Sequence, residues 1–285
     1  MADLKKRLAT NVEGAFFVDS TCIDCDACRQ VAPGTFAEDG DYSAVKKQPS
    51  SVEEIRRAWQ ALLTCPVGSI GCTSENKALE IQGDFPLLVE EDVYFCGFNS
   101  RDSYGANSYF ILNESGNWLV EAPRFVKAFA SKLEKMGGLK YIFLSHRDDV
   151  ADADDYAKVF SAKRIIHEDD LSAQPSAEIV LRGSDLSVYE KDFVVIPTPG
   201  HSKGHCVLLY KKKYLFTGDH LFWNRDEKRL DAHDRYCWYS WDKQRDSMKT
   251  LLDYDFEWVL PGHGQSVHLS VQEMKKHLAN LVDRM

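Results

Sequence analysis

Four cysteines in this chain have the spacing of ligands to an inorganic centre. Cys22, Cys25 and Cys28 are separated by two residues each, and Cys65 is followed directly by a proline. Two-residue gaps let a tight loop place three thiolates around one face of an iron–sulfur cube, and a cysteine–proline pair supplies the distant ligand. The alternative is a structural zinc site, but zinc ligands usually come as two close pairs. The pattern therefore favours one 4Fe-4S cluster on these four cysteines.

The neighbouring residues indicate that a second cluster site has been lost. Two-cluster bacterial ferredoxins carry the run C-x2-C-x2-C-x3-C-P, whose fourth cysteine serves the other cluster. Here Pro33 is retained, and counting back from Cys65 by the same spacing locates the remaining positions. Apolar residues occupy all four ligand positions of that second site: Ala32, Ile55, Ala58 and Ala61. The pattern predicts a single cube, and residues 14–82 resemble the single-cluster bacterial ferredoxins.

Four more residues that can bind metal each follow a strand-like apolar run. They are His146 after residues 141–144, His201 after 194–196, Asp219 after 214–216 and His263 after 258–260. Polar side chains just beyond the ends of strands are how α/β folds build sites at one edge of a sheet. We therefore expect these four side chains to converge on one rim.

The helix that carries the distant cysteine can be placed from local signals. Ser51 and Glu54 form a capping box, in which an oxygen at the N-cap pairs with a carboxylate three residues later. Apolar residues then recur at helical spacing as far as Leu63, so this helix should deliver Cys65 to the cluster.

After residue 83, strand-like and helical runs alternate, which is typical of a layered α/β architecture. Residues 109–112 and 118–120 flank a polar turn and predict a hairpin. Pro123 should open a helix as its first residue, and the glycine pair at 137–138 should close it. The aromatic stretch 236–241 either lines a substrate pocket or packs in front of a further helix.

The order of these motifs resembles the metallo-β-lactamase superfamily. A strand ending in His146 is followed by TPGH at His201, TGD at Asp219 and PGHG at His263, and the resemblance covers residues 85–285. It implies an αββα sandwich with a metal site at the sheet edge. The whole chain is similar to ferredoxin-fused members of this superfamily from photosynthetic organisms.

Two domains are therefore expected. The first is an α+β ferredoxin-like 4Fe-4S domain at residues 1–83. The second is an αββα metallo-β-lactamase sandwich at residues 84–285.

The first metal motif departs from the family pattern H-x-H-x-D-H. His146 matches the first histidine, and Asp148 stands where the second histidine should be. A shifted alignment puts Asp152 at the acidic position and Ala153 at the last histidine. Without that shift, this loop provides no ligand for a second metal. Asp149 is an alternative to Asp148, because the loop contains several carboxylates.

The resemblance implies two metal positions with unequal ligand sets. The first consists of His146, Asp148, His201 and Asp219. The second consists of Asp152, a bridging Asp219 and His263, and it lacks its usual histidine. Two histidines with carboxylates suit non-haem iron, although zinc accepts the same ligands. Flavodiiron proteins, which belong to this superfamily, also replace the second histidine by a carboxylate and bind iron. Iron is therefore favoured, and a degenerate site with one metal or none is the alternative.

Three functions compete. An oxidoreductase would pass single electrons from the cluster to the second metal centre, which reacts with a small oxidant, and a redox partner protein would serve it. A hydrolase of thioesters, lactones or phosphoesters would use the metal to activate water, with Asp152 as the catalytic carboxylate that orients the hydroxide. A non-catalytic module would only sense redox state. Hydrolysis needs no electrons, so the attached cluster favours the oxidoreductase acting on a small molecule.

Charge and hydropathy restrict the partners and the compartment. The 285 residues carry a formal net charge of −9, which argues against binding to nucleic acid and against a polybasic membrane surface. No apolar run approaches the roughly 18–20 residues of a membrane-spanning helix, and the first residues lack the apolar core of a secretory signal. We expect a cytoplasmic protein, or a chloroplast stromal one if a transit peptide is removed.

Overall fold

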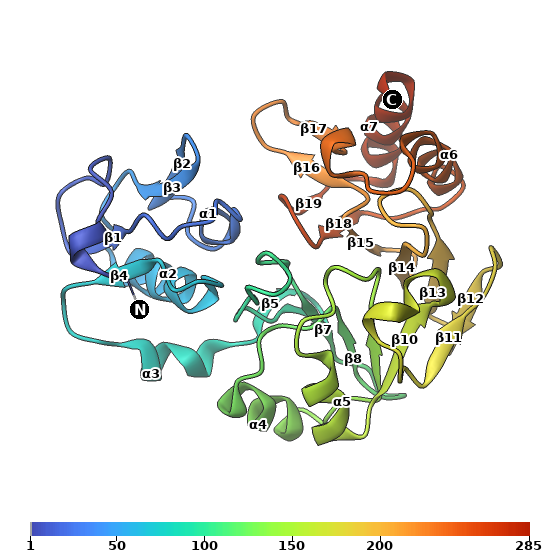
Figure 1. Cartoon of the computed structure of the whole chain (residues 1–285), viewed down its shortest axis with the longest axis horizontal. Coiled ribbons are helices and arrows are strands. Elements are labelled where there is room, and N and C mark those ends of the chain that lie inside the picture. Colours follow the sequence, from blue (N-terminus) through green and yellow to red (C-terminus); the bar gives the residue numbers. More distant parts are fainter. Residues whose placement is uncertain (1) are drawn as a thin grey trace.

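The computed structural model describes residues 2–285, and its N-terminal elements lie together on one side of the molecule (Figure 1). They enclose a small apolar core of their own. They are η1 (Leu4–Lys6), β1 (Phe16–Val18), α1 (Ala27–Val31), β2 (Phe36–Asp39), β3 (Tyr42–Val45), α2 (Val52–Thr64), β4 (Ile70–Cys72), α3 (Ala78–Ile81) and η2 (Gln82–Asp84). Strand β1 pairs antiparallel with β4, and β2 pairs antiparallel with β3. This part has the α+β ferredoxin-like character that the sequence predicts.

The helix that precedes the distant cysteine has the predicted start. The side chain of Ser51 accepts a hydrogen bond from the backbone of Glu54, and Glu54 returns one to the N-cap backbone, so the capping box is confirmed. Helix α2 ends one residue before Cys65. Ala58 and Ala61 on this helix are completely buried. Apolar packing therefore fills the space in which a second cluster would lie.

The rest of the chain forms two sheets packed face to face. The first sheet has seven strands in the order β11-β10-β9-β8-β7-β6-β5. They are β5 (Leu87–Glu90), β6 (Val93–Phe95), β7 (Tyr109–Ile111), β8 (Trp118–Val120), β9 (Tyr141–Phe143), β10 (Lys163–His167) and β11 (Ile179–Leu181). The predicted hairpin is confirmed as the antiparallel pair β7 and β8.

The second sheet has six strands in the order β12-β13-β14-β15-β18-β19. They are β12 (Ser187–Tyr189), β13 (Phe193–Pro197), β14 (Cys206–Tyr210), β15 (Tyr214–Gly218), β18 (Trp258–Pro261) and β19 (Val267–His268). Strand β14 runs antiparallel to both β13 and β15, and β15 runs parallel to β18. The carboxyl ends of β13, β15 and β18 therefore meet at one edge, as the sequence predicts.

Aromatic side chains join the two sheets, and helices cover their outer faces. Trp118 of the first sheet stacks on Phe193 of the second, with 4.3 Å between ring centroids. The covering helices and short outer elements are α4 (Lys127–Lys135), α5 (Ala153–Phe160), η3 (Glu168–Ala173), β16 (Phe222–Asn224), β17 (Arg229–Asp231), η4 (Asp234–Tyr236), α6 (Trp241–Leu251) and α7 (Val271–Arg284). Helices α4 and α5 belong to the apolar core of the first sheet, and α6 and α7 to that of the second. This layering is the predicted αββα sandwich.

Helix α4 begins four residues later than the sequence predicts, so the placement of Pro123 as its first residue is wrong. The backbone N–H of Arg124 donates to a carbonyl on the loop after β6, at 2.8 Å. The backbone N–H of Phe125 donates to the Asp152 carboxylate, at 2.6 Å. Because these tertiary bonds hold the segment extended, the first helical turn starts only after Val126. Within residues 2–285, no helix has the length and apolar character needed to span a membrane.

A candidate cluster pocket beside a candidate metal centre

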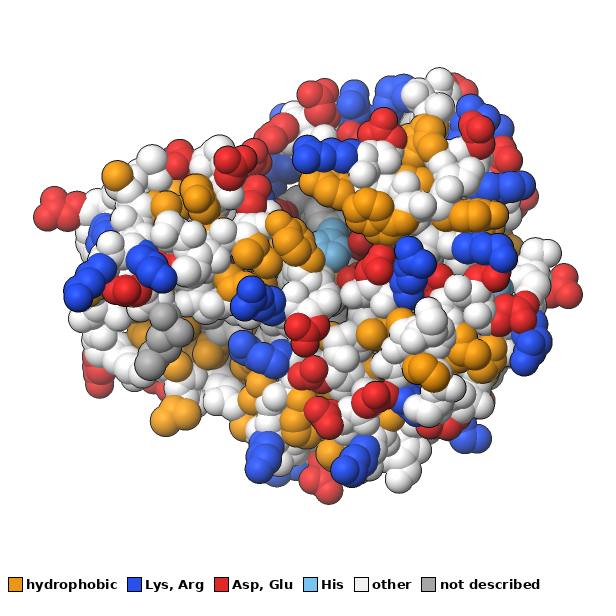
Figure 2. All heavy atoms as spheres, in the orientation of Figure 1, with side chains coloured by type: hydrophobic (Ala, Val, Ile, Leu, Met, Phe, Trp, Pro, Cys, Tyr) orange, Lys and Arg blue, Asp and Glu red, His pale blue; other side chains and the backbone are white. Residues whose placement is uncertain are grey.

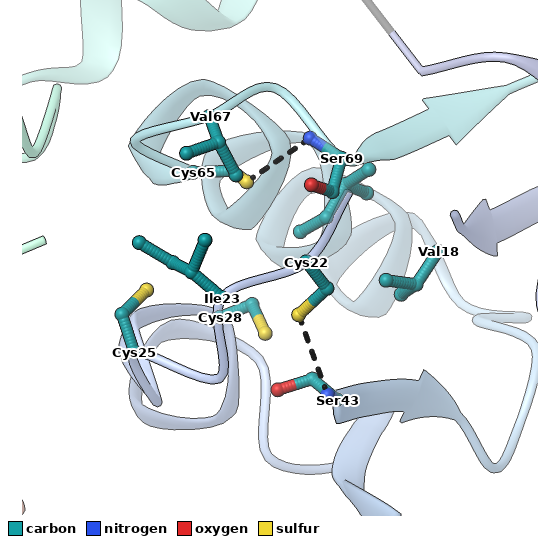
Figure 3. Close-up of a pocket in the computed structure, with 10 residues that line it drawn as sticks. Val18, Cys22, Ile23, Cys25, Cys28, Ser43, Cys65, Val67 and Ser69 are labelled. Carbon is teal, nitrogen blue, oxygen red and sulfur yellow. Dashed lines mark hydrogen bonds between the residues drawn. The ribbon is translucent and has the colours of Figure 1, made fainter. Parts of the chain in front are cut away.

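The four predicted cluster cysteines line a single pocket (Figure 3). Cys22 and Cys25 come from the loop before α1, Cys28 from α1 itself, and Cys65 from the end of α2. The backbone N–H of Ser69 donates to Cys65 Sγ at 3.3 Å. The other walls are largely apolar and are formed by Val18, Ile23, Val67 and Ile70, together with Ser43 and Ser69. Backbone donors aimed at sulfur stabilise the negative charge of thiolates in such a pocket.

The chemistry of these thiols fits a large cationic centre. Burial raises the pKa of Cys25 to about 12 and raises the pKa values of Cys28 and Cys65 as well. Such buried thiols become thiolates only when a metal compensates the charge. Around tetrahedral zinc, sulfurs at about 2.3 Å from the ion would lie about 3.8 Å apart. Within residues 2–285, no three of these sulfurs lie within 4.8 Å of one another. Four thiols around one pocket suit a 4Fe-4S cluster, which is held by four cysteine thiolates.

The predicted ligands of the first metal position also come together. His201 Nε2 lies 3.4 Å from Asp148 Oδ2 and 3.6 Å from Asp219 Oδ2. His146 Nε2 lies 3.8 Å from each of the same two oxygens. Ligands placed about 2.1 Å from a tetrahedral ion would be about 3.4 Å apart. The ligand atoms of His146, His201 and Asp219 all lie within 4.8 Å of one another and could hold one metal ion. Asp148 lies beside both histidines as a candidate fourth donor.

A second group of donors shares Asp219 with the first. Asp219 Oδ1 lies 2.8 Å from His263 Nδ1, and Asp149 Oδ2 lies 3.9 Å from the same nitrogen. Gly262 leaves room for this approach, because a Cβ there would be 2.7 Å from Asp149 Oδ2. The structure therefore brings together His263, Asp219 and Asp149 as a second candidate position, with Asp219 between the two.

Asp152 is the predicted site residue that the structure does not bring into this group. Its carboxylate lies at the start of α5 and accepts the hydrogen bond from Phe125 N–H. The shifted alignment that selected Asp152 is thus not supported by its position, either as a metal ligand or as a catalytic carboxylate. Ala151, with a positive φ of 33°, precedes it in the turn between Asp149 and α5.

Glu121 is a candidate that sequence reasoning missed. It directly follows the buried strand β8 and is 2% exposed, and its Oε1 accepts a hydrogen bond from Ser145 N–H at 3.1 Å. One of its oxygens groups with ligand atoms of His146 and Asp149. The four rim residues were predicted because each is a polar residue that follows a buried strand. Glu121 meets the same criterion and could have been identified in the same way.

The electrostatics of this group call for a cation. Burial raises the pKa of Glu121 to about 8 and raises the pKa of Asp149 well above its usual range. Burial opposes charge on His263 too, but the carboxylates of Asp219 and Asp149 raise its pKa to about 10. Buried negative charge without a partner is costly, so a bound metal ion would stabilise these carboxylates.

Two of the histidines, His146 and His201, present an unpaired ring nitrogen to such an ion. Burial lowers the pKa of His146 to about 4, so its ring is neutral at physiological pH. His146 Nδ1 lies 2.8 Å from the hydroxyl of Ser145, which orients the ring. Among the described residues, Nε2 of His146 and of His201 has no hydrogen-bond partner although each of these atoms is buried. Oriented imidazoles with one unpaired nitrogen are what a metal site requires.

Two more histidines pack behind the candidate ligands. The ring of His205 lies 5.3 Å from that of His146 and stacks on His220 at 5.3 Å. Thr198 Oγ1 lies 2.9 Å from His205 Nδ1 and fixes its ring. Burial lowers the pKa of both imidazoles, to about 3 for His220. These neutral rings support the ligands from behind.

Two exposed aromatic side chains lie beside the candidate ligands. Figure 2 shows a hollow between the two parts of the molecule, with histidine visible inside it and hydrophobic side chains along its border. The ring of Trp238 lies 6.1 Å from His201, and that of Tyr104 lies 6.5 Å from His263. Trp238 is 57% exposed and Tyr104 is 59% exposed. The pocket interpretation of residues 236–241 is therefore favoured for Trp238, and α6 starts after Ser240.

Comparisons with known proteins agree with both parts of this structure. Residues 18–72 match the 4Fe-4S single cluster domain of ferredoxin I. In overall fold the chain is similar to DIM-1 metallo-β-lactamase, at 19% identity over 69% of this chain and 95% of that one, with a TM-score of 0.55. TMB-1 gives 17% identity, 69% and 95% coverage, and a TM-score of 0.53. The B3 metallo-β-lactamase BLEG-1 gives 20% identity, 62% and 94% coverage, and a TM-score of 0.50.

The family match extends beyond the fold to the sequence of the larger part. Residues 104–263, which include every candidate ligand from Glu121 to His263, match the metallo-β-lactamase superfamily. This match spans more than half of the chain. The chain therefore belongs to the metallo-β-lactamase superfamily and carries an N-terminal single-cluster ferredoxin domain.

Proposed function

We propose that this protein is an oxidoreductase that passes single electrons between a 4Fe-4S cluster and a metal ion, preferably iron, in its metallo-β-lactamase domain. The supporting observation is a direct contact between the two sites. The side chain of Gln265, two residues after His263, donates a hydrogen bond to Asp26, which lies between two cluster cysteines. A hydrogen bond between segments that carry ligands of the two sites supports an exchange of electrons between them.

The donor set supports iron. The two positions combine three imidazoles with the carboxylates of Asp148, Asp149 and Asp219, and further oxygen comes from Glu121. Imidazole together with hard oxygen donors and open coordination positions suits non-haem iron, although zinc accepts the same groups. When bound, the metal would supply the site at which a small oxidant such as oxygen or nitric oxide reacts. The protein residues would hold the metal, neutralise its charge and keep the site open beside the two exposed aromatic side chains.

A hydrolase is the second candidate function, and the fold favours it. The similar solved structures are named as metallo-β-lactamases, and a metal held by histidines and carboxylates can activate water. Hydrolysis, however, gives the cluster no role, because it requires no electron transfer. The two proposals therefore differ in whether turnover depends on the redox state of the cluster.

Metal analysis combined with electron paramagnetic resonance is the first test. Iron and zinc are quantified in wild type and in His201→Ala, and the cluster is counted by its signal after reduction. Both proteins are then reduced and exposed to oxygen or nitric oxide. We expect His201→Ala to keep its cluster, to lose metal at the second site and to reoxidise its cluster more slowly.

Equal reoxidation rates in the two proteins would refute the electron-transfer proposal. Steady hydrolysis of a thioester or lactone by the fully oxidised protein would favour the hydrolase instead. The redox partner protein that reduces the cluster is part of the proposal, and in this test a chemical reductant replaces it.

A further inference from the structure

We infer that the segment Ser103–Gly105, in the loop between β6 and β7, is the contact that fixes the cluster against the metal site and sets the distance over which electrons pass. The electron-transfer part of this inference rests on the proposed function. The structural part concerns how this chain's own residues position its two sites. It assigns positioning roles to Tyr104 and Gly105.

Gly105 packs directly on the ligand environment of the cluster. A Cβ at this position would lie 2.8 Å from Cys25 Cβ and 2.9 Å from Cys25 Sγ. It would also lie 3.1 Å from Cγ of Pro66, which follows the fourth cysteine. Its φ of +88° is in the region that glycine adopts without strain. The backbone of the larger domain can therefore touch Cys25 only because residue 105 has no side chain.

Tyr104 connects the same segment to both sites. Its hydroxyl donates a hydrogen bond to the carbonyl of Ile23, between the first two cluster cysteines, at 2.8 Å. Its ring centroid lies 6.5 Å from that of the candidate ligand His263. One side chain thus spans from the cluster-binding loop to the metal group.

The loop is ordered by bonds of its own. Gly105 N–H donates to Ser100 O at 2.8 Å, and Gly105 O accepts from the buried amide of Asn99 at 2.7 Å. The loop is also tied to the turn that carries His263, because Asn107 N–H donates to Gly262 O at 2.7 Å. A turn restrained at both ends acts as a rigid spacer rather than as a mobile connection.

Side-chain bonds beside the segment keep the two parts in one orientation. The amide of Asn107 donates to Gln30 Oε1 at 3.1 Å, and the amide of Gln265 donates to Asp26. Both acceptors lie on or next to α1, which carries Cys28. The contact is therefore made from several directions around the cluster-binding loop.

This geometry has a redox consequence. In the proposed reaction, Cys22, Cys25, Cys28 and Cys65 would hold a cluster that could give one electron to a metal ion held by His146, His201 and Asp219. The cluster would then be oxidised and the metal ion reduced, and an external one-electron donor would restore the cluster. The rate of such a transfer falls steeply with the distance between the centres. A change that separates Gly105 from Cys25 should therefore slow the transfer without altering either set of ligands.

The test compares Gly105→Ala and Tyr104→Phe with a matched control, Gly183→Ala. Gly183 also has a positive φ, of +67°, but no atom lies within 4 Å of the position of its Cβ. Gly183→Ala therefore introduces the same kind of backbone strain as Gly105→Ala, but no steric clash. Cobalt(II) is loaded at the second site, the cluster is reduced, and the magnetic interaction between them is measured by the relaxation of the cluster signal.

We expect Gly105→Ala to keep cluster and cobalt but to show a smaller relaxation enhancement than wild type, and Gly183→Ala to match wild type. With native metal, cluster reoxidation in Gly105→Ala should be slower than in wild type, because the added Cβ pushes the cluster-binding loop away from the larger domain. Tyr104→Phe removes only one hydrogen bond and should have a smaller effect in the same direction. If Gly105→Ala fails to assemble its cluster, Tyr104→Phe provides the same comparison.

Wild-type relaxation in both variants would overturn the inference. The outcome that overturns only the proposed function is different. In that case Gly105→Ala loses the magnetic interaction, but cluster reoxidation in wild type is the same with and without the second metal. The segment would then still position the two sites, although electrons would not pass between them.

Discussion

Asp219 and His263 are joined by a contact of 2.8 Å between Oδ1 and Nδ1, while the other oxygen of Asp219 faces His146 and His201. One carboxylate thus serves both candidate metal positions. Its charge is the main reason that the pKa of His263 is raised despite burial. A residue that offers one oxygen to each side can bridge two ions, so both positions should depend on it.

Replacement of Asp219 should therefore remove metal from both positions. We expect Asp219→Asn to lose the metal at both positions of the metallo-β-lactamase domain. It should retain the cluster iron, because the cysteine pocket lies in the other domain. Metal content per chain, determined together with the cluster absorbance, checks this. Asp155→Asn is the matched control, since it removes one exposed carboxylate from α5. Retention of both metals by Asp219→Asn would contradict the bridging role.

Asp149 and Asp152 should have opposite phenotypes. Asp149→Ala should lose the metal at the position it shares with His263, because its buried oxygen has no hydrogen-bond partner among the described residues. Asp152→Ala should keep the metal and destabilise the fold by about 1 kcal/mol, since only the bond to Phe125 N–H is lost. Metal content and thermal unfolding distinguish the two. If Asp152→Ala loses metal and Asp149→Ala keeps its full metal content, Asp152 is the ligand, as the shifted alignment predicts.

The contrast between these two aspartates shows where sequence reasoning reaches its limit. The rim residues were predictable because each follows a buried strand, and parallel strands bring their ends together. Which carboxylate of the loop faces the metal depends on the backbone conformation around Ala151. The residue types of the motif alone do not predict that conformation. The predicted start of α4 is wrong for a similar reason. Long-range hydrogen bonds from the backbone of Arg124 and Phe125 hold this segment extended, although Pro123 favours the start of a helix.

The cluster pocket was predictable in more detail because its ligands are local in sequence. Three of the four cysteines lie in one short stretch of sequence, and the capping box fixes the helix that leads to Cys65. The contact of Gly105 with Cys25 was not predictable, because it joins residues of two domains that share no pattern. Spacing rules describe what one segment can hold, whereas the relation between two sites depends on how the domains pack.

Arg29 should stabilise the loop that carries the cluster. Its guanidinium lies 2.6 Å from Asp24 and 2.5 Å from Asp26, and its side chain is 10% exposed. Arg29→Leu leaves two carboxylates uncompensated beside the cysteines, which should cost on the order of 2 kcal/mol. We expect faster loss of the cluster to an iron chelator. Arg57→Leu, at an exposed position of α2, is the control, and equal rates of cluster loss would refute this role.

The capping box of α2 should make the helix that leads to Cys65 sensitive to acid. Backbone N–H groups of Ser50 and Ser51, and the ammonium of Lys47, lower the pKa of Glu54 from 4.5 to about 2. A carboxylate with a lowered pKa in the folded state contributes stability above its unfolded value and loses it as the pH falls. The contribution of Glu54 should thus be full above pH 4.5 and disappear near pH 2.

Glu54→Gln tests this, because glutamine keeps an acceptor oxygen and removes only the charge. At pH 7 the variant should unfold at a lower urea concentration than wild type, and the difference should shrink as the pH falls below 4.5. Far-ultraviolet circular dichroism from pH 7 to pH 3 measures the midpoints. Glu53→Gln removes the same charge from the same first turn without a capping bond. Since the helix dipole acts on both carboxylates, a smaller difference for Glu53→Gln isolates the capping bonds, and equal differences would assign the whole effect to the dipole.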